Sequence, residues 1–305
     1  MSVAAAATVP LPPTIWDRYH LDWGRRTYVM GIVNVTPDSF AGDGLLPTGA
    51  GSLSDPAVRD QVVQRAVAQA QQFVVEGATF IDVGGESTRP GASPISSAEE
   101  QERVLPVIRA LRAALPEDII ISIDTYRAEV ARQALEAGAN LINDIWGLRA
   151  DPEMAALAAE RGVPVVLMAN MRGFQKRDIV SDVLRFLAGS IEIALAAGVA
   201  WERIIIDPGI GFGTTPEENL TLLRRLSELR SLGRPLLLGT SRKSTIGLVL
   251  GGLPPQERVE GTAATVALGI AQGADIVRVH DVREIMRVVR MSDAIVRGAF
   301  SLPNS

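Results

Sequence analysis

Polar side chains that could do chemistry recur in this chain at the points where apolar runs end. They are Asn34, Asp82 with Glu86, Asp124, Asn143 with Asp144, Asn170, Asp207, Ser241-Arg242-Lys243, and Arg278 with His280. Any one of them is equally well explained as a turn or capping residue, because Asn and Asp favour such positions. Eight runs that all end this way favour a ring of polar strand ends around one shared site.

Part of this ring suits a flat heterocycle. The set combines two carboxylates, one amide and one cationic donor: Asp124, Asn143, Asp207 and Lys243. A carboxylate can accept two parallel N–H bonds from an aminopyrimidine edge, and the amide and ammonium groups can bind the remaining acceptors. We therefore expect a ring-shaped ligand with both donors and acceptors.

The last apolar run carries a pair of residues suited to an anion. Arg278 and His280 are two positions apart, so on a strand both side chains point to the same side. Lys243 and Arg242 end the preceding run. In (β/α)8 barrels, the fold predicted below, the ends of strands seven and eight commonly form a phosphate site. The alternative is a salt bridge between Arg278 and a neighbouring carboxylate.

A glycine-rich segment, Gly209-Ile210-Gly211-Phe212-Gly213, follows Asp207-Pro208. It could be a nest of backbone N–H groups for a phosphate. We favour a tight loop that places Phe212 at the rim of the site, because the cationic groups suited to phosphate lie elsewhere in the ring.

The elements that must position these residues follow from hydrophobic periodicity. Strands are expected at residues 27–35, 79–84, 119–125, 141–145, 164–168, 204–207, 236–240 and 276–280. Helices are expected at residues 58–76, 98–115, 128–137, 152–161, 179–197, 217–230, 260–272 and 282–300. Eight alternating units predict an α/β fold, a single-domain (β/α)8 TIM barrel. A doubly wound open sheet is the alternative, but no G-x-G-x-x-G follows the first strand.

We expect residues 1–26 to be an N-terminal tail and lead-in, and residues 27–301 to be the barrel. Long Gly-, Ser- and Pro-containing segments at 41–57 and 84–97 follow the first two strands. Long loops at the carboxyl ends of barrel strands usually handle substrate, so these two are expected to be substrate-handling lids.

Composition excludes several classes of function. The 305 residues include no cysteine, which rules out thiolate chemistry, and only two histidines, which nearly excludes a multi-histidine metal site. A metal would be a hard cation such as Mg²⁺, bound by oxygen. The net charge of −5 and the absence of a basic stripe argue against nucleic-acid binding. No signal peptide or membrane-spanning run is present, so we expect a cytoplasmic protein without membrane contacts.

Seven motifs together resemble the dihydropteroate synthase family. They are NVTPDSF at 34–40, DVGGESTRPG at 82–91, SIDTYR at 122–127, NDIWG at 143–147, DPGIGFG at 207–213, GTSRKSTIG at 239–247 and VRVHDV at 277–282. The resemblance implies a (β/α)8 barrel that condenses 6-hydroxymethyl-7,8-dihydropterin diphosphate with p-aminobenzoate, releasing pyrophosphate by an SN1-like displacement. It also implies that the protein catalyses a step of folate biosynthesis, is a target of sulfonamides and forms a homodimer.

The resemblance also assigns residues to three subsites. The pterin pocket is implied at Asp124, Asn143, Asp207 and Lys243. The diphosphate is implied at Asn34, Arg278 and His280, with Asn34 as a ligand of Mg²⁺. The p-aminobenzoate site is implied at Phe40, Thr88, Arg89, Pro90, Phe212 and Ser241. Catalysis is expected from Asp124, Asp207, Lys243, Arg278 and His280: the two carboxylates stabilise a pterin cation and the cationic groups neutralise the leaving diphosphate.

Some positions depart from the family pattern. Many relatives carry His where this chain has Ala169 and Lys where it has Thr214, and the loop at 41–57 is longer than usual. These departures keep a non-catalytic pterin-binding paralogue as one alternative. A methyltetrahydrofolate–corrinoid methyltransferase domain is the other, but it would not need TRPG, SRK and R-x-H together.

Overall fold

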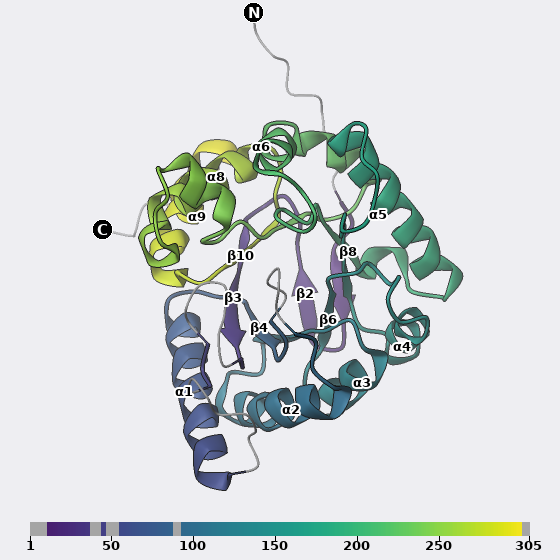
Figure 1. Cartoon of the computed structure of the whole chain (residues 1–305), viewed down its shortest axis with the longest axis vertical. Helices are drawn as coiled ribbons and strands as arrows, with labels where there is room; N and C mark the ends of the chain where they lie inside the picture. The colour runs from purple at the N-terminus through teal and green to yellow at the C-terminus, as the bar shows by residue number, and fades with distance from the viewer. Residues whose placement is uncertain (1–10, 37–43, 47–54, 88–92, 301–305) are drawn as a thin grey trace, which may run out of the picture.

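The chain folds into one barrel of eight parallel strands surrounded by helices (Figure 1). This computed structural model describes residues 11–36, 44–46, 55–87 and 93–300. The barrel strands are β3 (Tyr28–Asn34), β4 (Phe80–Gly84), β5 (Ile120–Asp124), β6 (Leu141–Asp144), β7 (Val165–Met168), β8 (Ile204–Asp207), β9 (Leu237–Leu238) and β10 (Ile276–Val279). They pair in the order β8-β7-β6-β5-β4-β3-β10-β9. A bridge between Ile206 and Leu236 joins the two ends of this order, so the predicted TIM barrel is confirmed.

The helices lie outside the strands, as the alternating pattern predicts. They are α1 (Pro56–Val75), α2 (Ser97–Ala114), α3 (Ala128–Glu136), α4 (Glu153–Arg161), α5 (Ile179–Ala196), α6 (Pro216–Arg224), α7 (Ser244–Val249), α8 (Val259–Ala271) and α9 (Val282–Val296). In the described part of the chain, no helix is long and apolar enough to cross a membrane.

Two helical predictions need correction. The helix expected at 217–230 ends at Arg224, and a 3-10 helix (Leu226–Leu232) follows it. Leu226 and Leu229 are both fully buried, and their spacing of three matches the 3-10 period rather than the α period. Helix α7 was not expected, because six residues are too few to show a 3.6-residue periodicity.

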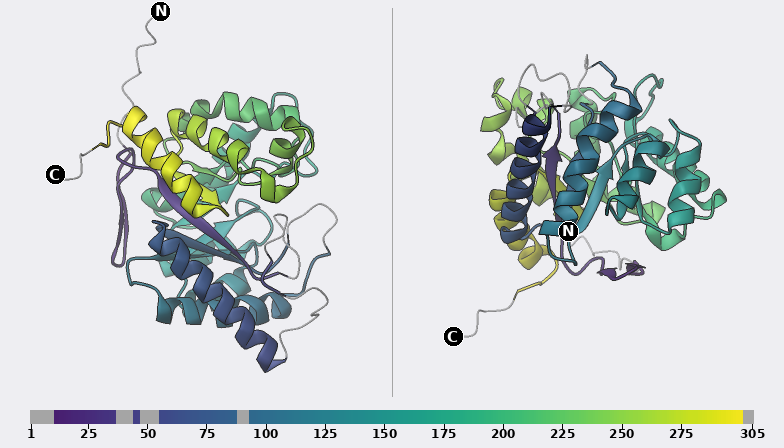
Figure 2. Two further views of the ribbon diagram at one scale, coloured as in Figure 1. Left: turned by 90° about the vertical axis from the view of Figure 1, so that its left-hand side faces the viewer. Right: turned by 90° about the horizontal axis from the view of Figure 1, so that it is seen from below.

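The amino-terminal end of the barrel is closed by a small hairpin (Figure 2). Strands β1 (Thr14–Trp16) and β2 (Tyr19–Leu21) pair in antiparallel orientation. Trp16, Tyr19, Leu21 and Trp23 pack in one cluster with inward-facing barrel residues such as Phe80. The lead-in therefore shares a core with the barrel, which explains why this segment is rich in aromatic residues. The boundary at residue 27 stays a prediction.

Each barrel strand alternates between two cores. Odd and even positions face the helices and the barrel interior in turn, so Ile81 and Val83 lie in the large outer core while Phe80 lies in the inner one. Towards the carboxyl ends, the inward positions change from apolar to polar, as at Asp82 and Asp124. This change places a polar site at one end only.

Candidate functional site

A cavity of about 260 Å³ opens at the carboxyl ends of the strands. The ring residues that line it are Asn34, Glu86, Asp124, Asn143, Asp207, Ser241, Lys243, Arg278 and His280. They come from seven of the eight strands or from the turns that directly follow them. The structure thus brings these residues together around one cavity, and their roles in a functional site stay a prediction.

Other ring residues do not line the cavity, and each has a local reason. Asp144 accepts bonds from the backbone N–H groups of Trp146 (2.8 Å) and Leu148 (2.8 Å), so it shapes the turn after β6. Asn170 donates to the carbonyl of Ile145 (3.2 Å). Asp144 is the last residue of β6 and follows the inward-facing Asn143, so alternation along the strand places it on the other face. Asn170 lies beyond the end of β7, where the sequence does not show the direction of a side chain.

Arg242 is also directed away from the cavity. Its guanidinium binds the carboxylate of Asp281, with Nε 2.9 Å from Oδ2. The backbone of Arg242 has φ +56°, a left-handed conformation that is unfavourable for a residue with a side chain. Within the stretch Ser241-Arg242-Lys243, it is the two outer residues that reach the cavity.

Arg278 is the centre of a buried ionic network. Its Nε lies 2.6 Å from Asp82 Oδ2, and its Nη2 lies 2.8 Å from Asp124 Oδ2. Asn143 Nδ2 donates to the same oxygen of Asp82 at 3.2 Å. The salt bridge considered as an alternative for Arg278 therefore exists, and Arg278 lines the cavity as well. Asp82 lies below the cavity and orients two of its lining residues.

Burial changes the acidity of two of the cavity carboxylates, Asp124 and Asp207. Desolvation raises the pKa of Asp124 to about 7, against the opposing effect of the Arg278 cation. Desolvation likewise raises the pKa of Asp207 to about 6, although the backbone N–H of Gly209 donates to it at 2.7 Å. Carboxylates with raised pKa values in a cavity are typical of functional sites, because desolvation strengthens their interaction with a bound charge.

Lys243 faces these carboxylates from the residue before α7, in the connection that follows β9. Desolvation lowers the pKa of its ammonium group to about 8, and Asp207 opposes that change. Its Nζ donates to the carbonyl of Ile210 and lies 4.4 Å from the centroid of the Phe212 ring. A cation held between a carboxylate and an aromatic face can bind a ligand acceptor at the same place.

The glycine segment after β8 is a tight loop. A side chain at Gly209 would place Cβ 1.9 Å from the carbonyl oxygen of Ala169, and one at Gly213 would place it 2.3 Å from the backbone nitrogen of Arg172. Both glycines also have positive φ. The loop brings Phe212 into the cavity wall, so the tight-loop interpretation is confirmed.

His280 and Ser241 are joined at the ends of β10 and β9. The Ser241 hydroxyl lies 2.8 Å from His280 Nδ1 and accepts the His280 backbone N–H at 3.1 Å. Both residues line the cavity. The serine thus fixes the orientation of the imidazole, whose Nε2 is the ring nitrogen that this contact does not use.

Four predicted p-aminobenzoate residues, Phe40, Thr88, Arg89 and Pro90, lie outside the described residues. Conversely, the cavity is also lined by residues that are not among the predicted site residues: Ile32, Thr36, Ser87, Ile145, Met168, Arg172, Gly211, Gly239 and Ser244. Inward alternation along β3, β7 and β9 could have identified Ile32, Met168 and Gly239. Arg172, which lies 5.2 Å from the centroid of the Phe212 ring, gave no signal because it is on a loop.

The two residues that depart from the family pattern, Ala169 and Thr214, both form hydrogen bonds within the fold. Ala169 is fully buried, and its backbone N–H donates to the carbonyl of Asp207 at 2.9 Å. Thr214 donates to Asn219 at 2.6 Å and accepts the backbone N–H of Gly211 at 3.1 Å. Thr214 therefore helps to hold the loop that carries Phe212.

Comparisons with known proteins agree with this geometry. The family model described as pterin binding enzyme matches residues 30–280. The dihydropteroate synthase of Synechocystis is 48% identical over 297 residues, which cover 94% of this chain and 96% of the relative.

Two solved structures are similar over nearly the whole barrel. The dihydropteroate synthase of Clostridium difficile in the presence of pteroic acid has a TM-score of 0.81 and 48% identity, covering 91% of this chain and 99% of that one. The Yersinia pestis dihydropteroate synthase in a sulfonamide complex has a TM-score of 0.80 and 42% identity, covering 92% and 97%. The sequence motifs, the barrel and these similarities together show that the chain belongs to the dihydropteroate synthase family of pterin-binding transferases.

Proposed function

We propose that this chain condenses 6-hydroxymethyl-7,8-dihydropterin diphosphate with p-aminobenzoate to give 7,8-dihydropteroate and pyrophosphate. The observation that carries this proposal is the cavity in which two buried carboxylates, an amide and a desolvated ammonium group face the cationic end of β10. The first four groups are complementary to the edge of a pterin. The cationic end is complementary to a leaving diphosphate.

The pterin is assigned to the inner part of the cavity. Asp124, Asn143 and Asp207 offer acceptors for its N–H groups and Lys243 offers a donor, so all four bind and orient the ring. The methylene carbon then points towards Arg278 and His280. In this orientation the bond that breaks joins that carbon to a diphosphate oxygen, and the bond that forms joins it to the amine nitrogen of p-aminobenzoate. The amine loses a proton and pyrophosphate leaves with the bonding electron pair.

The carboxylates and the cations have opposite tasks during this step. Positive charge develops on the pterin as the carbon–oxygen bond lengthens, and Asp124 and Asp207 stabilise it. Negative charge develops on the diphosphate, and Arg278 and His280 stabilise that. No covalent enzyme intermediate is required, in keeping with a chain without cysteine.

The residues present fit Mg²⁺ bound mainly by the substrate. Among the described residues, no group of three or more His, Asp or Glu side chains could hold a metal by itself. Mg²⁺ commonly keeps several waters and takes substrate phosphate oxygens with one or two protein oxygens. Asn34, which lines the cavity, would supply that protein oxygen. When bound, the ion neutralises diphosphate charge.

The proposed p-aminobenzoate site lies towards the cavity mouth. Phe212 and Ser241 line the cavity and would contact the ring and the carboxylate of this substrate. Phe40, Thr88, Arg89 and Pro90 complete the proposed set. Because sulfonamides resemble p-aminobenzoate, we expect them to compete for the same subsite, as the complex of the Yersinia pestis relative suggests.

We also propose a homodimer. Large apolar side chains are exposed on and just after α7, α8 and α9: Leu248, Leu268, Met291, Ile295 and Phe300. On α9, Ile285 and Val289 pack into the core between the helices and the barrel, whereas Ile295 is 71% exposed. Sedimentation of Ile295→Glu tests the proposal, because a charge at a dimer contact should give monomers. A cytoplasmic location stays a prediction.

One assay tests the reaction. The purified protein is incubated with the dihydropterin diphosphate, p-aminobenzoate and Mg²⁺, and both dihydropteroate and pyrophosphate are measured. We expect equal amounts of the two products. Absence of dihydropteroate at high protein concentration would contradict the synthase proposal and favour a non-catalytic pterin-binding protein. Arg278→Ala should reduce turnover at least tenfold, roughly the effect of one lost charge-assisted contact.

A further inference from the structure

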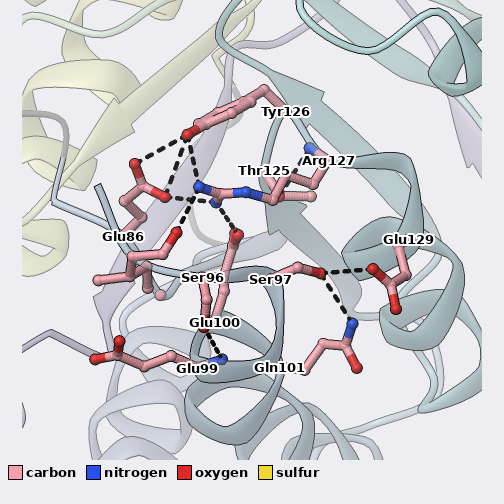
Figure 3. Close-up of polar contacts among 12 residues, drawn as sticks. Glu86, Ser96, Ser97, Glu99, Glu100, Gln101, Thr125, Tyr126, Arg127 and Glu129 are labelled. Carbon is pink, nitrogen blue, oxygen red and sulfur yellow. Dashed lines mark hydrogen bonds and ion pairs between the residues drawn. The ribbon is translucent and has the colours of Figure 1, made fainter.

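An ionic cluster lies beside the cavity at the start of α3 (Figure 3). The Arg127 guanidinium is at its centre, between β5 and α3. It contacts Glu86 and Glu100, and its Nη2 donates to the Tyr126 hydroxyl at 2.8 Å. The same Nη2 donates to the carbonyl of Ile95 at 2.8 Å. One planar group is thus bound to four acceptors at once.

These acceptors belong to both ends of one connection. Glu86 comes two residues after β4, and Ile95 comes two residues before α2. Glu100 is in the first turns of α2 itself. Arg127 therefore binds the start of the β4–α2 connection, its end, and the helix into which it leads. Because the guanidinium comes from the turn between β5 and α3, it ties this connection to the neighbouring unit of the barrel.

The start of the connection is part of the cavity wall. Glu86 and Ser87 line the same cavity as Asp124 and Lys243. The Tyr126 hydroxyl donates to Glu86 at 3.1 Å, and burial together with Glu86 raises the pKa of Tyr126 to about 12, so the hydroxyl keeps its proton. Glu86 is consequently held from two sides, by Arg127 and by Tyr126.

The cluster differs from an ordinary surface salt bridge. The side chain of Glu100 is only 1% exposed, and burial raises its pKa in spite of the nearby Arg127. Without the guanidinium, the buried carboxylate of Glu100 would lose its cation and Glu86 would lose one of its two anchors. A lysine keeps the charge but lacks the planar fork, so it cannot reach the same acceptors together.

We infer that Arg127 is a positioning residue that keeps the p-aminobenzoate end of the cavity in shape by fixing Glu86 and Ser87. This inference rests on the proposed function, in which the pterin occupies the inner cavity and p-aminobenzoate the mouth. Arg127 itself does not line the cavity. Its effect should therefore fall on one substrate and spare the other.

Steady-state kinetics of Arg127→Lys test this. We expect the KM for p-aminobenzoate to rise about tenfold, the equivalent of one weakened charge-assisted contact. The KM for the dihydropterin diphosphate and the affinity for a pterin analogue, measured by calorimetry without p-aminobenzoate, should stay within about twofold. The matched control is Arg132→Lys on the same helix, since Arg132 forms a surface pair with Glu160 (3.3 Å) away from the cavity.

A second variant covers the case in which the Arg127→Lys substitution prevents folding. Arg127→Ala leaves room for a guanidinium ion, and added guanidinium at millimolar concentration should lower the p-aminobenzoate KM again. If Arg127 only supported the fold, its substitution would raise the KM values of both substrates or of neither, and either result would overturn the inference. Failure of guanidinium to lower the p-aminobenzoate KM of Arg127→Ala would overturn it as well. If the unmodified enzyme makes no dihydropteroate, it is the proposed function that fails.

Discussion

The two ends of the barrel interior carry side chains of opposite character. At the amino-terminal end, Phe80, Ile120 and Leu141 are almost completely buried and pack under the aromatic hairpin. Two residues further along the same strands, the inward positions are Asp82, Ser122 and Asn143. The strands are continuous, so a single alternation of side chains builds a dry core at one end and a polar cavity at the other.

This difference separates stability from function. Apolar burial at the amino-terminal end stabilises the fold without touching the cavity. At the carboxyl end, burial opposes the charged forms of Asp124, Asp207 and Lys243, so these groups are kept at a cost to folding. Substitutions at the two ends should therefore have opposite signatures.

The largest effect is expected from Phe80→Ala at the dry end. Phe80 is fully buried and packs edge-on against Tyr28 with the ring centroids 6.1 Å apart. Its removal should lower the free energy of unfolding by about 3–5 kcal/mol, measured by urea denaturation. KM values of the folded fraction should not change. The control is Ile15→Ala on the exposed side of the hairpin, where we expect almost no effect; a large change of KM in Phe80→Ala would break the separation.

Lys243→Met should give the opposite signature. Methionine replaces the side-chain volume but removes the donor, so pterin affinity and turnover should fall roughly ten- to a hundredfold, the equivalent of about 1.5–3 kcal/mol. The free energy of unfolding should stay the same or rise, because desolvation disfavours the lysine cation in the fold. Lys176→Met is the matched control, since Lys176 pairs with Glu218 and donates to the carbonyl of Gly213 at 2.6 Å but does not line the cavity. A strong loss of stability in Lys243→Met would contradict the comparison.

The pH dependence of pterin binding sharpens the same contrast. Asp124 and Asp207 must be ionised to accept pterin N–H groups, and their pKa values are raised to about 7 and about 6. Affinity for a pterin analogue should fall at least tenfold as the pH is lowered from about 8 to about 6. It should also fall as the pH is raised above about 8, because Lys243 then loses its proton.

Stability of the unliganded protein should respond with the opposite sign. A carboxyl whose pKa is higher in the folded state binds its proton more tightly there, so its contribution is present at acid pH and lost as pH rises towards 6–7. Calorimetric titration and urea denaturation at matched pH values measure both trends. An affinity that does not change with pH would show that these carboxylates do not face the ligand.

The sequence predicted the elements well because each strand is a nearly continuous apolar run. The predicted ends of seven barrel strands lie within one residue of the observed ends, and Asp124, Asp207 and Arg278 could be placed in one ring by counting along their strands. The exception is β9, whose prediction at 236–240 compares with Leu237–Leu238. Beyond this short strand, Gly239 and Ser241 leave the sheet to form part of the cavity wall.

The parts that could not be predicted depend on backbone direction after a strand ends. Arg242 leaves the site because of a left-handed backbone angle, and Asn170, beyond the end of β7, turns back to bind the carbonyl of Ile145. The Arg127 cluster joins residues 41 positions apart in the sequence, Glu86 and Arg127, which only the barrel brings together. Neither periodicity nor motif spacing contains this information.

The smallest expected effect lies in the hairpin, and it tests how far the closed end is independent of the cavity. The Tyr19 hydroxyl accepts a bond from Asn140 Nδ2 at 2.5 Å and one from Arg112 at 3.3 Å, which ties the hairpin to the β5–β6 side of the barrel. Tyr19→Phe keeps the ring and removes these bonds, so the free energy of unfolding should fall by about 1 kcal/mol. Turnover and both KM values should be unchanged, because the hydroxyl lies at the opposite end of the strands from Asp124. A measurable change of either KM would mean that the hairpin and the cavity are coupled through the barrel, and the comparison of two independent ends would have to be given up.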